Sequence, residues 1–265
     1  MKKNTEPRKM LSVILWLHPL AVFILIFCII NGIDIVLRVK AQQAPSSELT
    51  LNSQLFDAEW SADGQYFALA SQNGVLVYSD TLELIASFQG NTGNVISVTW
   101  SPTGDYSASA GGRGDNTIRI WQFNRNTGTF SQIQVMTIPA SVVFLVKWSP
   151  DGSKLASVSL ADSILTNIDR AVGMVDVWNT QTWIRINQEP LFLFATQRAL
   201  TWNSDSRKLA VAGEGGAAII ELDTYKVLYN SDNLGTYGSE ITNVDWSTTN
   251  QIALASSQLF IWKAP

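Results

Sequence analysis

The stretch VKWSPDGSKLASVS, residues 146–159, carries the pattern that decides the fold. Apolar and polar residues alternate up to Trp148, as they do in a strand with one buried face. Ser, Pro, Asp and Gly follow, and these residue types tolerate the backbone angles of a tight turn. A second alternating segment, KLASVS, comes after the turn. The stretch therefore predicts two antiparallel strands joined by a short turn.

Four more versions of this phrase occur along the chain. They are AEWSADGQYFALAS (58–71), VTWSPTGDYSASAG (98–111), LTWNSDSRKLAVAG (200–213) and VDWSTTNQIALASS (244–257). The five aligned tryptophans are 40, 48, 54 and 44 residues apart, which is the period of a supersecondary unit. A small residue also recurs in the second strand of every copy, where we expect the units to crowd together: Ala68, Ala108, Ala156, Ala210 and Ala253.

Each period has room for two more strands. The third strands are expected at 74–78, 117–121, 174–178, 217–222 and 259–262, and weaker fourth strands at 82–88, 130–136, 183–188 and 225–230. A helical solenoid is excluded, because the apolar residues recur every second position and not every third or fourth. Four strands per period of 40-odd residues predict a β-propeller with five blades.

Residues 95–121 (VISVTWSPTGDYSASAGGRGDNTIRIW) and residues 146–159 resemble the repeats of WD-repeat propellers. The resemblance covers about residues 47–265, and it implies an all-β, five-bladed WD-repeat-like β-propeller that binds proteins. Asp115 corresponds to the family's aspartate before the third strand, and Trp121 to its terminal tryptophan. The family's histidine between blades is missing, with Asn91 in its place before the second blade. The family's His-Ser-Asp-Trp hydrogen-bond network is therefore expected to be incomplete.

The first 40 residues differ in character from the rest. Residues 1–9 are basic and form the expected cytoplasmic tail, and residues 10–30 are almost wholly apolar. A helix of that length spans roughly 30 Å, the thickness of a hydrocarbon core. Because basic residues precede the apolar run, we predict one transmembrane signal-anchor helix over 10–37 with the following residues outside the cytoplasm. The alternative is a signal peptide cleaved near Ala41, which would give a secreted protein.

A polar linker at 38–46 then leads into the propeller at 47–265. The fifth repeat has sequence for three strands before Pro265. SELTLNSQ (47–54) alternates in the same way, so we expect it to pair with this last blade as its fourth strand and close the ring. The alternatives are an open arc completed by another subunit and a truncated gene product.

Composition excludes several kinds of chemistry. The single histidine, His18, and the single cysteine, Cys28, both lie in the apolar run, so Ser-His-Asp and Cys-His catalysis and a cysteine-rich zinc site are excluded. Residues 42–265 contain 12 basic and 20 acidic residues, a net charge of −8. A domain this acidic repels phosphate backbones, so we expect no nucleic-acid partner. No phosphate-binding loop, metal site or cofactor motif is present in the sequence.

The longest excess over the repeat is ADSILTNIDRAVG (161–173), between the second and third strands of the third blade. The WD-repeat resemblance places it on the same face as residues 111–116. Long loops often carry function, so we predict a protein-binding surface here. Its candidate residues are Arg113, Asp115, Asp162, Leu165, Asp169 and Arg170. The alternative is an insertion without a partner, and Arg113-Gly114-Asp115 is then an ordinary turn.

These features predict a non-catalytic protein-interaction scaffold, displayed outside the cytoplasm on a membrane anchor. Two alternatives remain open. One is an exported propeller hydrolase of the glycosidase kind, with two carboxylates facing each other across the channel. The other is a fragment of a larger WD-repeat receptor or regulatory protein.

Overall fold

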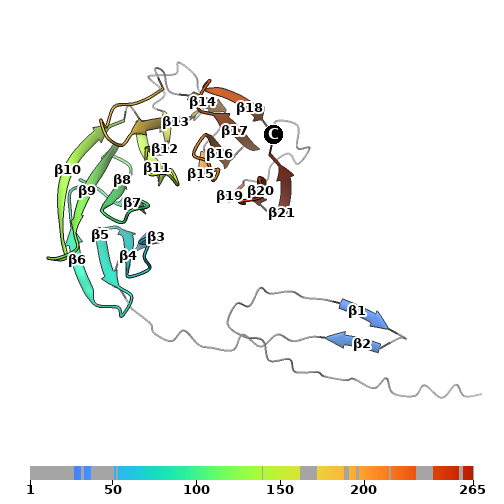
Figure 1. Ribbon diagram of the computed structural model, residues 1–265, viewed down its shortest axis with the longest axis horizontal. Helices are drawn as coiled ribbons and strands as arrows, with labels where there is room; N and C mark the ends of the chain where they lie inside the picture. Colours follow the sequence, from blue (N-terminus) through green and yellow to red (C-terminus); the bar gives the residue numbers. More distant parts are fainter. Residues whose placement is uncertain are drawn as a thin grey trace, which may run out of the picture. The chain divides into compact units, whose positions relative to one another are not determined.

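Five antiparallel sheets follow one another in the computed structural model, in the order that the repeats predict (Figure 1). The structure describes residues 27–30, 33–36, 51, 53–138, 140–161, 172–187, 191–194, 197–214, 216–230, 241–256 and 259–264. Within each sheet, every strand pairs with its neighbour in the sequence. For the described part of residues 51–265 the structure thus confirms an all-β arrangement of three- and four-stranded antiparallel sheets.

The first two sheets consist of β3 (Leu55–Trp60), β4 (Tyr66–Ser71), β5 (Gly74–Ser79) and β6 (Leu84–Phe88), then β7 (Val95–Trp100), β8 (Tyr106–Gly111), β9 (Thr117–Asn124) and β10 (Thr129–Thr137). The third and fourth consist of β11 (Ala140–Trp148), β12 (Lys154–Ala161), β13 (Val172–Asn179) and β14 (Leu191–Phe194), then β15 (Gln197–Trp202), β16 (Lys208–Gly213), β17 (Gly216–Glu221) and β18 (Lys226–Asn230). The fifth consists of β19 (Asn243–Trp246), β20 (Gln251–Ala255) and β21 (Leu259–Lys263).

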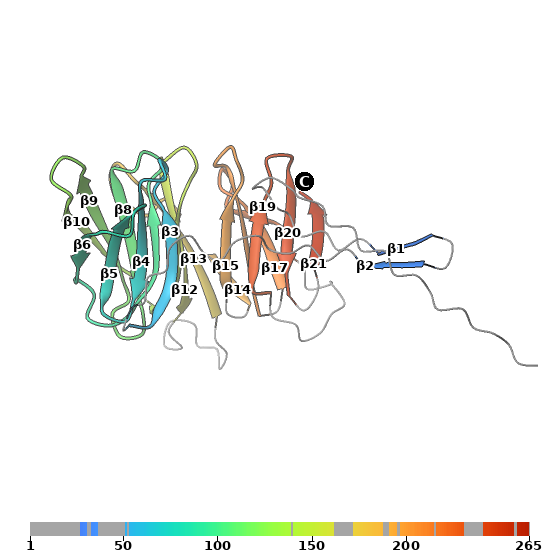
Figure 2. The same cartoon turned by 90° about the horizontal axis from the view of Figure 1, so that it is seen from below.

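The sheets of residues 51–265 stand side by side along an arc. Figure 1 shows the first strand of each sheet, β3, β7, β11, β15 and β19, on the inside of this arc. Figure 2 shows the same sheets from the side, with their antiparallel strands aligned roughly along one common axis. This is the arrangement of propeller blades around a channel, and it turns the five aligned tryptophan strands toward one centre.

Every junction between neighbouring sheets repeats one contact. Val98 and Trp100 of β7 pack on Ala68, Ala70 and Val77 of the first sheet. The other three junctions join Val146 and Trp148 to Ala108, Ala110, Ile118 and Ile120; Leu200 and Trp202 to Ala156, Val158, Val175 and Val177; and Val244 and Trp246 to Ala210, Ala212, Ala217 and Ile219. The recurrent alanine therefore makes room for the tryptophan of the next sheet.

The first and fifth sheets each leave one such face uncovered by any described residue. Trp60 is 56% exposed, whereas Trp100, its counterpart in the second sheet, is 4% exposed. On the fifth sheet Leu259 and Ile261 are 70% and 57% exposed. The predicted closing strand, 47–54, lies mostly outside the described residues. Of its described part, Gln54 accepts a hydrogen bond from the Gln72 backbone N–H (3.0 Å), in the first sheet.

The fourth strand of the third sheet differs from the prediction. It lies at Leu191–Phe194 and not at 183–188. Residues 184–187 still run beside β13, but only Arg185 makes a bridge there, to Trp178. The side-chain Oδ1 of Asn187 accepts the hydrogen bond of the Val177 N–H (2.9 Å) in place of a ladder carbonyl. Because that bond displaces regular pairing, the sequence after it supplies the strand.

The amino-terminal segment also differs from the prediction where it is described. Residues Phe27–Ile30 (β1) and Ile33–Val36 (β2) form an antiparallel pair, not part of a helix. Ile and Val favour strands, and the Asn-Gly dipeptide between them in the sequence is typical of hairpin loops. The remainder of the predicted span, residues 10–26, 31–32 and 37, lies outside the described residues. Among the described residues, no helix is long and apolar enough to cross a membrane.

The hydrogen-bond network that was expected to be incomplete is continuous in the second sheet. The indole N–H of Trp121 donates to Ser109 Oγ (2.9 Å), and Ser109 donates to Asn91 Oδ1 (3.4 Å). The amide of Asn91 donates in turn to Thr117 Oγ1 (3.4 Å), whose hydroxyl bonds Asp115. Asparagine carries both an acceptor and a donor, so it replaces the missing histidine as a bridge.

We predict that the two tryptophans of the first strands differ sharply in their effect on stability. Trp100→Ala should lower the free energy of unfolding by about 3–5 kcal/mol, because it removes a buried ring from a sheet junction. Trp60→Ala should lower it by about 1 kcal/mol or less, because solvent already reaches that ring. Chemical denaturation of both variants measures this difference, and equal losses would contradict the junction scheme.

Asp176 on β13 is the buried carboxylate of the third sheet. It is fully buried, accepts hydrogen bonds from Arg185 (3.2 Å) and Asn187 (3.4 Å), and has no partner for its Oδ2 among the described residues. Burial raises the pKa of Asp176 and outweighs the positive charge and hydrogen bonds of Arg185 and the bond from Asn187. The folded chain therefore holds a proton on Asp176 more tightly than the unfolded chain does.

Because this pKa is raised on folding, the contribution of Asp176 to stability is greatest below the ordinary value of 3.8 and declines as the pH rises through the folded pKa. We predict that Asp176→Asn raises the unfolding temperature at pH 7 and changes it much less at pH 4. Thermal unfolding at both values measures this, with Asp80→Asn at an exposed position as the control. A variant less stable than the parent at pH 7 would contradict the prediction.

Candidate functional site

The inner strands line an open cavity of about 580 Å³ at the centre of the arc. Each strand contributes the polar residue that precedes its aligned tryptophan: Glu59, Thr99, Lys147, Thr201 and Asp245. Side chains alternate along each strand, so the tryptophan and its polar neighbour point to opposite faces. The tryptophan packs in a sheet junction, or lies on the open face of the first sheet, and the polar residue points toward the centre. One pattern in the sequence therefore builds both the core and the wall of the cavity.

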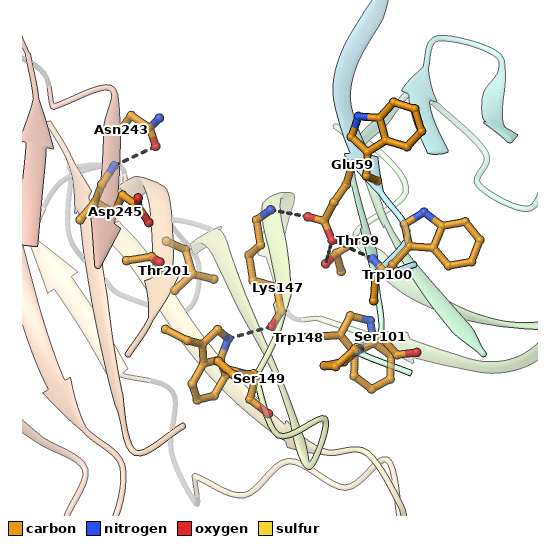
Figure 3. A pocket seen from close by; sticks show the side chains of 17 residues that line it. Glu59, Thr99, Trp100, Ser101, Lys147, Trp148, Ser149, Thr201, Asn243 and Asp245 are labelled. Carbon is orange, nitrogen blue, oxygen red and sulfur yellow. Dashed lines mark hydrogen bonds and ion pairs between the residues drawn. The ribbon is translucent and has the colours of Figure 1, made fainter. Parts of the chain in front are cut away.

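On one side of the cavity the polar residues contact one another. Glu59 accepts hydrogen bonds from the Thr99 hydroxyl (2.8 Å) and the Trp100 backbone N–H (2.9 Å). Its other oxygen pairs with the ammonium group of Lys147. Figure 3 shows Lys147 reaching toward Glu59 from β11. The first, second and third sheets are thus joined by charge and hydrogen bonding at the cavity wall.

The opposite side of the cavity is more open to solvent. Asn243 and Asp245 are exposed, and Figure 3 shows both on the far side of Lys147 from Glu59. Among the described residues, each of these side chains accepts one hydrogen bond, from the backbone N–H of its own following residue, at 2.9 Å. This side therefore offers a carboxylate and an amide to a molecule at the cavity mouth.

The cavity wall carries two acidic side chains, Glu59 and Asp245. In the described part of the chain, no group of three or more His, Cys, Asp or Glu side chains is placed to hold a metal ion. The acidic side chains of the wall are of two kinds. Glu59 is engaged by Thr99, Trp100 and Lys147, whereas Asp245 faces solvent.

Only two of the six candidate residues predicted on the loop face lie among the described residues. Arg113 is exposed in the turn between β8 and β9. Asp115 is buried, and it accepts hydrogen bonds from Thr92 and Thr117 within the chain. Four of the candidates lie outside the described residues: Asp162, Leu165, Asp169 and Arg170.

The cavity residues were missed at the level of sequence. Their signal was present, since a polar residue stands directly before each aligned tryptophan. Because side chains alternate, that residue lies on the face of the strand opposite to the tryptophan. In an antiparallel sheet with one buried face, the other face is ordinarily exposed to solvent. Only the arc of five sheets turns these positions toward a shared centre.

Repeated antiparallel sheets around a shared cavity define a propeller-like repeat protein. The family model "WD domain, G-beta repeat" matches residues 82–122, which include the second sheet up to Gln122 in β9. The chain is similar to the WD repeat-containing protein srw1 of Schizosaccharomyces pombe, with 22% identity over 259 residues, 90% of this chain and 42% of that protein. It is also similar to the uncharacterized WD repeat-containing protein sll1491 of Synechocystis, with 34% identity over 115 residues, 43% of this chain and 31% of that protein.

These matches support the WD-repeat family for this chain. The chain spans less than half the length of both of these relatives. The similarity therefore concerns the repeats, and it does not assign the activity of either whole relative to this chain.

Proposed function

We propose that this chain is a non-catalytic protein-interaction scaffold, with a partner that docks at the mouth of the central cavity. WD repeats generally mediate contacts between proteins. The observation that carries the proposal is the convergence of five polar side chains on one cavity of about 580 Å³. Fold alone does not establish function, so the proposal rests on this wall and on the availability of Asp245 at the mouth.

The partner is expected to be basic or neutral where it contacts this mouth. Lys147 is paired with Glu59, so the charge that remains available at the wall is the carboxylate of Asp245. The net charge of −8 over residues 42–265 acts in the same direction at longer range. Association should therefore weaken as salt is added.

We further propose that the sheets are displayed outside the cytoplasm and that the apolar segment beginning at Met10 associates with the membrane. The support is the sequence, in which basic residues 1–9 precede the apolar run and few follow it. The face of loops 111–116 and 161–173 remains a second candidate docking surface, with Arg113 as its described basic residue.

We predict that Asp245→Lys lowers recovery of the partner from cell envelopes at least tenfold, because it reverses the available charge at the cavity mouth. The measurement is an affinity pull-down with the full chain at low and moderate salt. Asp80→Lys is the matched control, since Asp80 is exposed and its side chain makes no hydrogen bond or ion pair with a described residue. Arg113→Glu in the same experiment tests the loop face.

If Asp245→Lys recovers as much partner as the wild type and Arg113→Glu recovers less, the partner binds the loop face and not the cavity mouth. Hydrolase activity of the purified chain on glycosides, with no partner recovered, would contradict the scaffold proposal altogether.

We predict that protease added to sealed spheroplasts digests residues 51–265 and spares the amino-terminal segment. The reason is the orientation that the basic residues before the apolar run impose. Immunoblotting with tags at the two ends of the chain follows the two parts. Complete protection of the sheets would place them in the cytoplasm, and a mature chain beginning at Gln42 would indicate cleavage.

A further inference from the structure

A second cavity, of about 550 Å³, opens between the second and third sheets. We call it the Trp148 groove. Its wall includes Tyr106 of β8, Trp148 of β11 and Trp183 after β13, with Ile133 of β10 and Asp151 of the β11–β12 turn. Trp148 also contributes to the central cavity, but the other four residues do not.

The preceding junction shows why a groove exists here. Between the first and second sheets, Phe123 and Phe130 stack on each other (4.5 Å between ring centroids) and both meet Trp100 edge-on, at 5.6 and 5.7 Å. Phe123 stands two residues after the Trp of the third strand, and the same position in the third sheet is Thr180. Thr180 donates its hydroxyl to the Gly152 carbonyl (2.7 Å) and fills no such space.

The walls of the Trp148 groove are aromatic. Tyr106 and Trp148 lie nearly parallel, with centroids 6.5 Å apart, and Trp183 meets Trp148 edge-on at 5.9 Å. Trp183 has a φ of 57°, a left-handed conformation that bulky residues rarely adopt. The corresponding turns of the first, second and fourth sheets place Leu82, Gly128 and Tyr225 in the same left-handed region, so this turn accepts side chains of different kinds. A tryptophan at this position adds an aromatic surface that the turn itself does not require.

A carboxylate stands at the rim. Partial burial would raise the pKa of Asp151, but hydrogen bonds from Ser149 and Ser153 together with the charge of Lys154 lower it. Asp151 is thus ionised at neutral pH, and it is exposed. Aromatic faces attract cations, and a neighbouring carboxylate strengthens that preference.

We propose that the Trp148 groove binds an arginine side chain of a partner protein. Guanidinium is planar and stacks on aromatic rings, and it also pairs with carboxylates, so arginine fits this wall better than a compact ammonium group does. The inference rests on the proposed function in that the ligand belongs to a protein, and it adds a second docking position outside the central cavity.

The test uses the detergent-solubilised full chain labelled with ¹⁵N-tryptophan and a capped Ala-Ala-Arg-Ala-Ala peptide. We expect the peptide to shift the indole N–H resonances of Trp148 and Trp183, assigned by single substitutions. A citrulline peptide of the same shape, which lacks the charge, should bind at least tenfold more weakly. Asp151→Asn should weaken binding several-fold, whereas Asp80→Asn should leave it unchanged.

Thr180→Phe is the sharpest variant, because it places at the second junction the kind of ring that fills the first. Thr180→Phe should abolish peptide binding while the circular dichroism spectrum remains that of the parent. Trp183→Ala should also abolish binding, and it replaces Thr180→Phe as the test if that variant fails to fold. Undiminished binding in both variants, or equal binding of the citrulline peptide, would overturn the inference.

The two proposals fail separately. Peptide binding that is lost with Asp245→Lys and kept with Thr180→Phe would place arginine in the central cavity, which overturns the groove and leaves the scaffold in place. Peptide binding at the groove without any partner recovered from envelopes would support the arginine-binding groove and contradict the proposed docking at the central cavity.

Discussion

The structure depends on one repeated contact, the packing of a first-strand tryptophan on the small-residue face of the preceding sheet. A sheet with an apolar face must bury it, and here such a face is buried only where a neighbouring sheet covers it. Trp100 is covered in this way and Trp60 is not, although both stand at the same place in their repeats. Burial is therefore a property of the junction and not of the residue type.

The same contact fixes the position of the polar residues. Because side chains alternate along a strand, a tryptophan held in a junction turns its polar neighbour toward the centre of the arc. Glu59, Thr99 and Lys147 meet there from three different sheets. The cavity wall is thus a consequence of core packing, and residues far apart in the sequence become one surface.

Differences between repeats show where the scheme is adapted. Phe123 and Phe130 fill the first junction, whereas Thr180 leaves a groove at the second. Asn91 forms hydrogen bonds with both Ser109 and Thr117, at the position where WD-repeat proteins usually have a histidine. These exchanges preserve the junction contact itself. They change only the space and the hydrogen bonding around it.

The sequence by itself determined the five sheets and the strand that carries each tryptophan, because period-two alternation and turn residues act locally. It could not place the fourth strand of the third sheet, since the Asn187 side chain replaces a ladder bond there. It also predicted a helix where β1 and β2 pair, because apolar residues alone do not separate the two conformations. The convergence of Glu59, Lys147 and Asp245 was decided only by tertiary structure, since it requires the angle between sheets, and no single repeat contains that angle.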